Sequence, residues 1–392
     1  SFIAADPLKS ARRTLDLARL GTLSGRRNML MVSHDRGGGT EQHINEETRR
    51  LEAEGWSVYT LRPGSGGPDT ARLSHARADL LPQLSDLPLR ENWLWKALTL
   101  LRIERVQVHH LIDFSADAPL IFARRLSQGG IPYTTTVHDY FAACPRVNMV
   151  TLSGHYCGEP KPGGCDACLL SRGSHTGETS ILKWRRRHGV FLAGARSVRV
   201  PDRDVATRLK KYFPDLRHVE VVPHEPDLVP RRAPRVPRRD GPFRVAVIGA
   251  IGPIKGYDVL LGFARHAIAA DLGAEISLFG YSRDDSTLRE NGVRVTGPYL
   301  NDAIQSQIDD VDPDVIWIPS LWPETYCYTL SIALESGRPI AAFDIGAIGT
   351  RLRDAGRGHL IPLDLAGDPA ALWRRFRSAA LSRTGARERL VS

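Results

Sequence analysis

Short apolar runs alternate with amphipathic helical patterns along most of the chain. In the first half the apolar runs lie at 28–33, 57–61, 106–111, 133–137 and 217–223. The pattern then restarts, with runs at 243–249, 276–280, 315–319 and 339–343. Strand-like runs separated by helical patterns predict parallel sheets with crossover helices. We therefore predict an α/β protein with two Rossmann-like domains that face each other across a cleft, the expected ligand site.

A segment rich in proline and arginine separates the two halves. The stretch HEPDLVPRRAPRVPRRDGPF holds five prolines and five arginines, which excludes a helix interior and indicates an extended linker. We expect an N-terminal helical extension at 1–26, a first Rossmann-like domain at 27–224 and a linker at 225–242. A second Rossmann-like domain at 243–371 and a C-terminal helix at 372–392, which crosses back, would follow.

Length and composition agree with a folded protein of two domains. The chain has 392 residues, is 42% hydrophobic, and contains no apolar run near the roughly 18 residues of a spanning helix. Five cysteines and no secretory signal favour a reducing compartment, so we expect a cytoplasmic protein. The first residue is Ser1 rather than methionine, which leaves open that further domains of a longer polypeptide accompany this one.

The net charge of +9 is unevenly distributed. The first 240 residues carry a balance of +11, whereas the remainder carries −2. A basic first half could face nucleic acid, anionic lipid or a phosphate-bearing substrate, or it could be a solvated basic surface. Because no nucleic-acid-binding motif accompanies the charge, we do not expect a nucleic-acid partner.

Glycine-rich turns follow the first predicted strand of each half. Gly38 and Gly39 precede a helical pattern, whose free N–H groups could bind an anion. In the second half the turn is GAIGPIKG, which includes Gly252 and Lys255 and fits neither the dinucleotide fingerprint nor the phosphate loop of nucleoside triphosphatases. Its lysine suits a phosphate group, although either turn could be purely structural.

The stretch WPETYCYTLSIALESG, at 322–337, leaves the carboxyl end of a predicted strand and enters a helix. Ligands of open α/β sheets bind at that end of the strands. The helix N-terminus near Tyr328 and Thr329 could hold a diphosphate while Glu324 reaches sugar hydroxyls. The alternative is that Glu324 only caps the helix.

Taken in order, these motifs resemble the retaining glycosyltransferases of family 4 (group 1), which have the GT-B fold. The matching pieces are GGGTEQH, TVHDYFAACP, GAIGPIKGYDVLL, SLFGYSRDD, TGPY and WPETYCYTLSIALESG, and they extend over roughly residues 27 to 365. The resemblance implies transfer of a sugar from a nucleotide-diphosphate donor (dTDP-, GDP- or UDP-linked) to a glycan or lipid-linked acceptor during surface polysaccharide or glycoconjugate assembly. The first domain would hold the acceptor and the second the donor.

The resemblance also assigns roles to individual residues. His138 would touch the transferred sugar, Lys255 would neutralise the diphosphate, and Glu324 would bind sugar hydroxyls. The remaining donor contacts would come from Gly38, Gly39, Gly252, Tyr281, Pro298, Tyr299, Tyr328 and Thr329. Proteins of this family are thought to use the donor phosphate to help deprotonate the acceptor. The resemblance therefore implies neither paired carboxylates nor a divalent metal for catalysis.

The chain departs from the family pattern at two places. The family places a second glutamate eight residues after Glu324, on the ribose hydroxyls, and Ile332 stands there instead. Glu335 is about 60° off that helix face and is more easily read as a surface residue. Ala250 and Ile251 occupy the region of the family's usual arginine. A deoxyribose donor such as a dTDP-sugar would explain Ile332. The rival hypothesis is a catalytically silent domain that serves a larger protein as a binding or scaffold module.

Two further groups of residues could bind metal. Cys144, Cys157, Cys165 and Cys168 follow the spacing C-x12-C-x7-C-x2-C in a glycine- and proline-rich segment, which could form a structural zinc site. Four reduced thiols packed in a loop are the alternative. The run Asp310, Asp312 and Asp314 resembles a metal-binding Asp-x-Asp, but a solvated turn is the preferred interpretation.

The segment ILKWRRRHGVFLAG at 181–194 mixes a basic cluster with Trp184 and Phe191. It could lie on an anionic membrane surface, because acceptors in this family are often lipid-linked. A helix of the domain with a basic exposed face is the preferred interpretation. We therefore expect at most a peripheral contact with the inner face of the membrane.

Overall fold

The computed structural model describes residues 27–75, 84–151, 154–225 and 241–381. These residues form two compact units. Unit 1 holds residues 27–147, Pro160–Pro201 and Ala206–Val222, and unit 2 holds Asn148–Glu159, Asp202–Val205 and the residues from Pro223 on. The expected N-terminal extension at 1–26 and nearly all of the expected linker at 225–242 lie outside the described residues.

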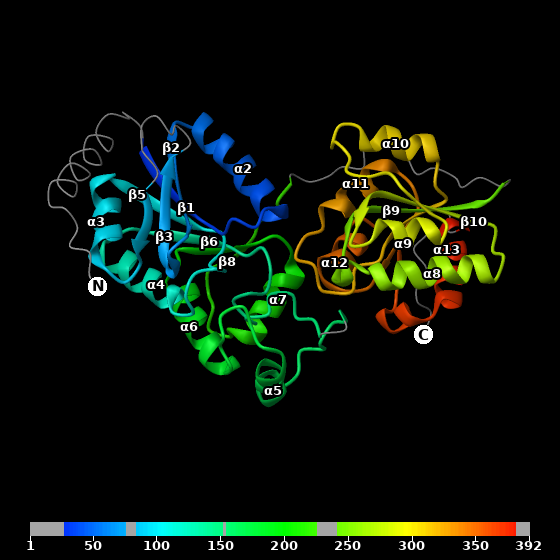
Figure 1. The fold of residues 1–392 in the computed structure, drawn as a ribbon. Coiled ribbons are helices and arrows are strands. Elements are labelled where there is room, and N and C mark those ends of the chain that lie inside the picture. The colour runs from blue at the N-terminus through cyan, green and yellow to red at the C-terminus, as the bar shows by residue number, and fades with distance from the viewer. Residues whose placement is uncertain (1–26, 76–83, 152–153, 226–240, 382–392) are drawn as a thin grey trace. The chain divides into compact units, whose positions relative to one another are not determined.

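The sheet of unit 1 is mixed (Figure 1). The neighbours from β2 through β1 to β8 run parallel, whereas β3 and β4 pair antiparallel at one edge. In sheet order the strands are β4 (Leu84–Pro88), β3 (Gly67–His75), β2 (Trp56–Gly64), β1 (Arg27–Val32), β5 (Ile103–Val108), β6 (Tyr133–Thr136), β7 (Ser197–Val200) and β8 (Val219–Val221).

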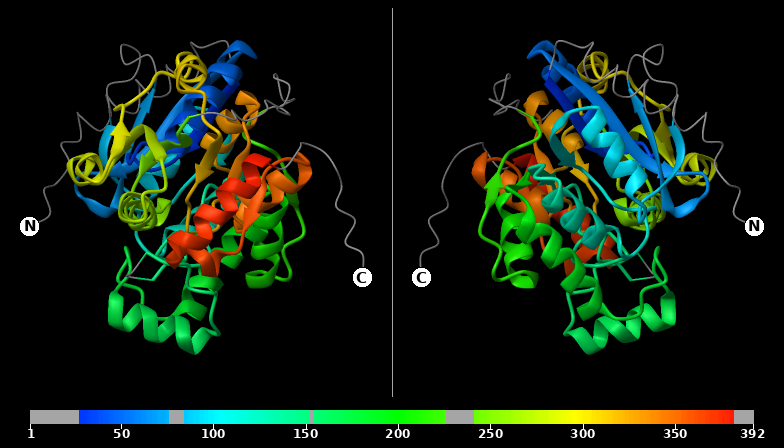
Figure 2. Two further views of the ribbon diagram at one scale, coloured as in Figure 1. Left: turned by 90° about the vertical axis from the view of Figure 1, so that its right-hand side faces the viewer. Right: turned by 90° about the vertical axis from the view of Figure 1, so that its left-hand side faces the viewer.

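Helices connect these strands, and α2 covers part of one face. Met29 and Met31 of β1 point to the same side because strand side chains alternate, and they pack with Ile44 and Leu51 of α2. Helices α4 and α6 lie against each other, while α5 buries little and lies at the periphery of the unit (Figure 2). The helices are α2 (Gly38–Ala53), α3 (Asn92–Leu100), α4 (Ala118–Gln128), α5 (Pro162–Arg172), α6 (Ile181–Gly194) and α7 (Arg203–Tyr212).

The sheet of unit 2 is parallel throughout its recorded strand pairs and has the order of a Rossmann fold. Numbered from its own first strand, the order reads 3-2-1-4-5-6, so the chain switches direction across the sheet between β9 and β12. In sheet order the strands are β11 (Val293–Val295), β10 (Ala274–Ser282), β9 (Phe243–Ile251), β12 (Val315–Ile318), β13 (Ile340–Phe343) and β14 (His359–Ile361).

Both faces of this sheet are covered by helices, so its strands are apolar on both sides. Val245 and Val247 of β9 belong to one core cluster, whereas Ala246 and Ile248 belong to the other. Helices α8 (Tyr257–Ala269), α9 (Asp285–Glu290) and α13 (Pro369–Leu381) supply the first cluster, together with the short helices η1 (Pro253–Lys255) and η2 (Leu363–Gly367) beside it. Helices α10 (Ile304–Val311), α11 (Tyr328–Ser336) and α12 (Gly346–Asp354) supply the second.

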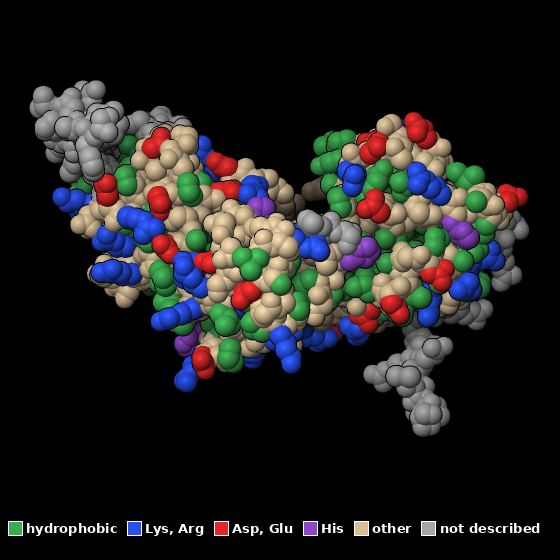
Figure 3. Space-filling view, turned by 60° about the horizontal axis from the view of Figure 1, so that its bottom comes forward, with side chains coloured by type: hydrophobic (Ala, Val, Ile, Leu, Met, Phe, Trp, Pro, Cys, Tyr) green, Lys and Arg blue, Asp and Glu red, His purple; other side chains and the backbone are tan. Residues whose placement is uncertain are grey.

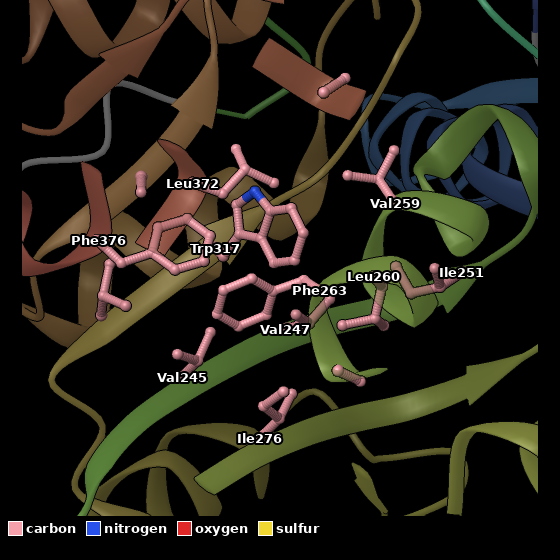
Figure 4. Packing of buried hydrophobic residues seen from close by; sticks show 14 of the residues in the cluster. Val245, Val247, Ile251, Val259, Leu260, Phe263, Ile276, Trp317, Leu372 and Phe376 are labelled. Carbon is pink, nitrogen blue, oxygen red and sulfur yellow. The ribbon is translucent and has the colours of Figure 1, made fainter. Parts of the chain in front are cut away.

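Three aromatic rings form the centre of the first cluster (Figure 4). Phe263 of α8 packs edge-on against Trp317 of β12 and against Phe376 of α13, with ring centroids 5.7 and 5.0 Å apart. The described part of the C-terminal helix thus packs on unit 2 itself. The rest of the expected crossing helix, 382–392, lies outside the described residues.

Two sequence expectations need correction. The first sheet was expected to be parallel, but β3 and β4 add an antiparallel edge. The strand expected at 106–111 ends at Val108, so His109, His110 and Leu111 lie beyond its carboxyl end.

No helix in the described part of the chain is long and apolar enough to cross a membrane. On the face of unit 1 seen in Figure 3, Lys and Arg side chains are interspersed with Asp and Glu.

Candidate functional site

The carboxyl edge of the unit 2 sheet brings Lys255 and Glu324 together. Lys255 lies in the turn after β9, and Glu324 lies in the loop after β12. Because β9 and β12 are neighbours, these two loops meet at the switch point, where ligands of this fold bind. The Lys255 Nζ lies 2.7 Å from the Glu324 Oε2, with 35% of the lysine side chain and 5% of the glutamate side chain exposed.

Glu324 has spare hydrogen-bonding capacity. Its Oε1 is buried and has no hydrogen-bond partner within the described residues. A buried carboxylate oxygen without a partner is costly, and a hydroxyl donor from a ligand would remove that cost. The helix-capping alternative does not apply, because α11 begins after Cys327 and has no side-chain cap.

The surroundings of Lys255 keep its side chain protonated. Burial alone would lower the pKa of Lys255, but the Glu324 carboxylate more than offsets this, and the pKa is raised. Tyr299 and Cys327 lie close enough to interact electrostatically with Lys255. Burial, together with the Glu324 carboxylate, raises the pKa of Cys327 to about 11, so its thiol is neutral. Lys255 therefore remains an ammonium group, as binding a phosphate requires.

The N-terminus of α11 is held by an arginine from α12. Cys327 adopts a left-handed backbone (φ 72°), which is strained for a residue with a side chain. The Arg351 Nη1 donates to the carbonyl oxygens of Tyr326 and Cys327 at 2.8 and 2.9 Å. Its Nη2 donates to the Ser331 Oγ at 2.8 Å, and its guanidinium lies 4.1 Å from the Tyr326 ring centroid. This clamp fixes the turn between Glu324 and the amides of Tyr328 and Thr329.

Two glycines allow the loops at this edge to approach closely. Gly256 has φ +86°, and a Cβ there would lie 2.1 Å from the carbonyl oxygen of Pro319. Gly346 has φ +59°, and a Cβ there would lie 2.6 Å from the backbone of Pro323. The turns after β9 and β13 are therefore packed directly against the loop that carries Glu324.

The other expected donor contacts lie on the same edge. Gly252 directly follows β9, and its carbonyl accepts from the amide of Lys255 at 3.1 Å. Tyr281 lies near the end of β10 and is 48% exposed. Gly297 donates to the Gly280 carbonyl at 2.8 Å, which places the turn containing Pro298 and Tyr299 beside β10.

Ile332 and Glu335 lie on the side of α11 that contacts α10. Ile332 is partly buried and packs against the second core cluster, as Tyr299 also does. The Gln305 Nε2 donates to the Ile332 carbonyl at 3.0 Å and to Glu335 at 3.4 Å. Glu335 thus has a local partner on α10, in line with its interpretation as a residue outside the site.

In unit 1 the switch point lies between β1 and β5, and histidines gather there. His109 follows β5, His138 follows β6, and His43 lies on α2. The His109 Nδ1 lies 3.0 Å from the His138 Nε2. Burial lowers the pKa of His109 to about 3, so its imidazole is neutral. Gly38 and Gly39 are exposed at the N-terminus of α2, where an anion could approach them.

The cysteine group and the acidic run expected to bind metal are not among the clusters of possible metal ligands in the described residues. No three of Cys144, Cys157, Cys165 and Cys168 offer sulfur atoms within 4.8 Å of one another. Cys157 belongs to unit 2, and the other three belong to unit 1. The acidic run near 310 is used in packing: Asp312 pairs with the buried Arg338, and the Asp314 carboxylate accepts from the amide of Arg244 at 2.8 Å. The zinc site therefore stays a prediction.

Sequence reasoning missed Arg351, His43, Glu47 and His109. Each contributes through contacts with residues far away in the chain, and only His43 lies in one of the motifs, GGGTEQH. The H-x3-E spacing of His43 and Glu47 on one helix face was the only local indication.

Known proteins resemble this chain in part of its sequence and in its fold. Residues 37–228 match the model of the family described as Glycosyltransferase Family 4. No curated protein sequence matches the chain.

Solved structures share the fold at low sequence identity. Sucrose-phosphate synthase from Thermosynechococcus elongatus has a TM-score of 0.52 and 15% identity, covering 91% of this chain and 94% of its own. The apo lipopolysaccharide outer core galactosyltransferase WaaB has a TM-score of 0.56 and 13% identity, covering 91% and 92%. Anabaena HepE in complex with UDP-glucose has a TM-score of 0.51 and 13% identity, covering 90% and 91%. The family match thus covers just under half of the chain, and the solved structures show that the chain has the GT-B fold.

Proposed function

We propose that this chain is a retaining glycosyltransferase that takes a sugar from a nucleotide-diphosphate donor bound on unit 2. The observation that carries the proposal is the Lys255–Glu324 pair at the switch point, with the second carboxylate oxygen of Glu324 buried and unpartnered. The ammonium group of Lys255 suits a diphosphate, and the unsatisfied carboxylate oxygen of Glu324 suits a sugar hydroxyl.

The donor would lie along the carboxyl edge of the sheet. Lys255 and the amides of Tyr328 and Thr329 would hold the diphosphate, and Glu324 would bind the sugar. Tyr281 and the turn of Pro298 and Tyr299 would lie near the nucleobase. HepE, which shares the fold, is described in complex with UDP-glucose, which supports a nucleotide-sugar as the donor class.

Transfer with retention passes through an oxocarbenium-like state as the diphosphate departs. The charge that develops on the leaving group is the largest electrostatic demand, and Lys255 with the α11 N-terminus answers it. The donor phosphate would help deprotonate the acceptor, so this step needs no metal. On unit 1, His138 would contact the transferred sugar, and Gly38 and Gly39 would approach the diphosphate.

The nucleoside of the donor would contain deoxyribose, which has one hydroxyl fewer than ribose. An isoleucine cannot accept hydrogen bonds, and Ile332 stands where the family has its ribose-binding glutamate. A dTDP-sugar lacks one of those hydroxyls. Its binding affinity would therefore be reduced less by an isoleucine at this position than that of a UDP- or GDP-sugar.

The acceptor would be a glycan or a lipid-linked saccharide, handled in the cytoplasm or at the inner face of the membrane. Trp184 and Phe191 of α6 are buried, which favours the domain-helix interpretation of that segment. The same helix exposes Leu182 (59%) and Val190 (51%) beside the exposed Lys183 and Arg186, a combination that suits a peripheral contact with anionic lipid.

The test is turnover of a donor panel by the full chain. The purified protein is incubated with UDP-glucose, GDP-mannose, dTDP-rhamnose and ADP-glucose, and the released nucleotide is quantified by mass spectrometry. We expect one nucleotide class to be released in a reaction that Glu324→Gln slows at least tenfold. With an acceptor present, NMR of the product should show the anomeric configuration of the donor. Inversion would refute the retaining mechanism.

The rival is a catalytically silent domain, and Ile332 together with the absent arginine near Ala250 motivates it. The donor panel separates the two, because a silent domain releases no nucleotide from any donor, with or without Glu324.

A further inference from the structure

The histidine cluster of unit 1 has the geometry of a metal centre. His43, His109 and His138 each offer a ring nitrogen, and these three nitrogens lie within 4.8 Å of one another. The ring centroids form a nearly equilateral triangle, with separations of 5.7, 5.2 and 5.3 Å. Three imidazoles that bind one tetrahedral ion through bonds of about 2 Å have centroids about 5 Å apart.

We propose that His43, His109 and His138 form a binding site for a divalent transition metal of the zinc type, with an open fourth position. The donor set of three imidazoles matches zinc sites that keep one position for water or substrate. All three residues lie at the carboxyl edge of the unit 1 sheet, at or next to its switch point. The inference concerns this unit alone and does not depend on the identity of the donor.

Glu47 supplies the carboxylate that orients the histidines in such sites. Its Oε2 lies 3.4 Å from the His43 Nε2 and 3.6 Å from the His109 Nε2. A carboxylate only accepts hydrogen bonds, so the proton of the His43 ring belongs on its Nε2. The His109 Nε2 lies beyond hydrogen-bond distance of Glu47. The Nδ1 of His109 is the atom that faces the His138 Nε2, at 3.0 Å. A ring N–H directed at a carboxylate is the usual support of a metal-bound histidine.

Glu47 is itself held firmly. It is 7% exposed, and its Oε2 accepts from the Gln107 Nε2 at 2.7 Å. Its Oε1 accepts from Arg50 at 3.2 Å and lies 3.6 Å from an Arg199 Nη1. These contacts leave Glu47 little freedom, which is the rigid support that a preorganised metal site needs.

A cavity lies beside two of the three histidines. A space of about 50 Å³ is lined by His109 and His138, with Thr136, His188 and Phe141 around it. About 10–15 Å³ of such space is enough for one water molecule, so the cavity accommodates a water beside His109 and His138. His43 does not line this cavity.

The test is metal binding by the full chain after removal of any polyhistidine tag. The protein is stripped with a chelator, loaded with Zn²⁺, dialysed into metal-free buffer and analysed by inductively coupled plasma mass spectrometry. His43→Gln and His109→Gln should each lower the bound zinc at least tenfold relative to wild type. The matched control is His218→Gln, an exposed histidine of the same unit, which should leave it unchanged.

A second comparison excludes the cysteines as the source of the metal. A Cys165→Ser/Cys168→Ser variant should keep the ion that the histidine variants lose, and Co²⁺ in that variant should give the visible bands of a tetrahedral nitrogen site. Circular dichroism checks folding. If His109→Gln does not fold, His43→Gln decides, because His43 is only partly buried. Retention of zinc by a folded His43→Gln variant, or less than a tenth of an equivalent in wild type, would overturn the proposal.

Discussion

Lys255 and Glu324, 69 positions apart in the chain, form a direct ion pair at the switch point of the second sheet. The pair is asymmetric, because the carboxylate is buried while the ammonium group remains about one-third exposed. A ligand can therefore reach Lys255 without first displacing Glu324. The pair keeps the buried carboxylate compensated until a donor supplies a hydroxyl to its second oxygen.

Removal of Lys255 alone should destabilise the protein, and neutralising Glu324 as well should recover most of the lost stability. Lys255→Met leaves a buried carboxylate without its partner and should lower the unfolding free energy by about 1–3 kcal/mol, less than for a fully buried pair. Glu324→Gln in the same chain should recover most of that loss. Chemical unfolding of the two single variants and the double variant measures the coupling. The control is Arg90→Met, whose ion pairs are exposed and which should change stability by less than about 1 kcal/mol. Equal losses of unfolding free energy in Lys255→Met and in the double variant Lys255→Met/Glu324→Gln would contradict the prediction.

Ile332→Glu should restore recognition of the ribose. A carboxylate at this position can accept from both hydroxyls of a ribonucleotide, so affinity for UDP relative to dTDP should rise about tenfold, the value of one charged hydrogen bond. Competition titrations with the two nucleotides measure the ratio. Glu335→Gln is the control, because Glu335 contacts Gln305 instead. An unchanged ratio in Ile332→Glu would show that residue 332 does not face the ribose.

Arg351→Lys should weaken donor binding without contact between Arg351 and the donor. Lysine cannot reproduce the planar fork that serves Tyr326, Cys327 and Ser331 at once, so the strained turn before α11 should relax. We expect KM for the donor to rise about tenfold, with a smaller change in kcat. Arg353→Lys, on the same helix but half exposed, is the matched control. A loss confined to kcat would argue against a positioning role.

His188 should make the protein sensitive to mild acid. Burial lowers its pKa from 6.5 to about 3 in the folded protein, partly offset by its contact with the Trp184 carbonyl. Between these values the unfolded chain binds more protons, so stability falls as pH drops from about 6.5 toward 3. Between pH 7 and pH 5, the unfolding free energy of His188→Gln should fall by about 2 kcal/mol less than that of the wild type. Urea unfolding at both pH values measures this, with the exposed His218→Gln as control. Parallel losses in all three proteins would contradict it.

Most of the second sheet could be predicted from the sequence. Strands β9, β12 and β13 are buried on both faces, and such strands form continuous apolar runs. Strands β3 and β4 were missed because they lie at an edge and contain glycine, proline and aspartate, which are rare in strands. The end of β5 was misplaced because His109, His110 and Leu111 are as buried as the strand that they follow.

The candidate site could be predicted only in part. Lys255 and Glu324 lie in motifs, but their contact depends on β9 and β12 being neighbours, and sheet order is not encoded locally. Arg351 and the gathering of His43, His109 and His138 depend on contacts between distant elements, which the motifs that contain His43 and His138 do not reveal. The aromatic residues of α6 were ambiguous in sequence, because core and membrane faces have the same composition until burial separates them.

The most direct test of the account is calorimetric titration of the full chain with UDP, GDP, dTDP and ADP, repeated with Lys255→Ala. We predict micromolar binding of one nucleotide, with dTDP preferred, and loss of that binding in the variant. Failure of all four nucleotides to bind a folded wild-type chain would contradict the assignment of a donor site to Lys255 and Glu324. That result would instead favour the silent-domain alternative.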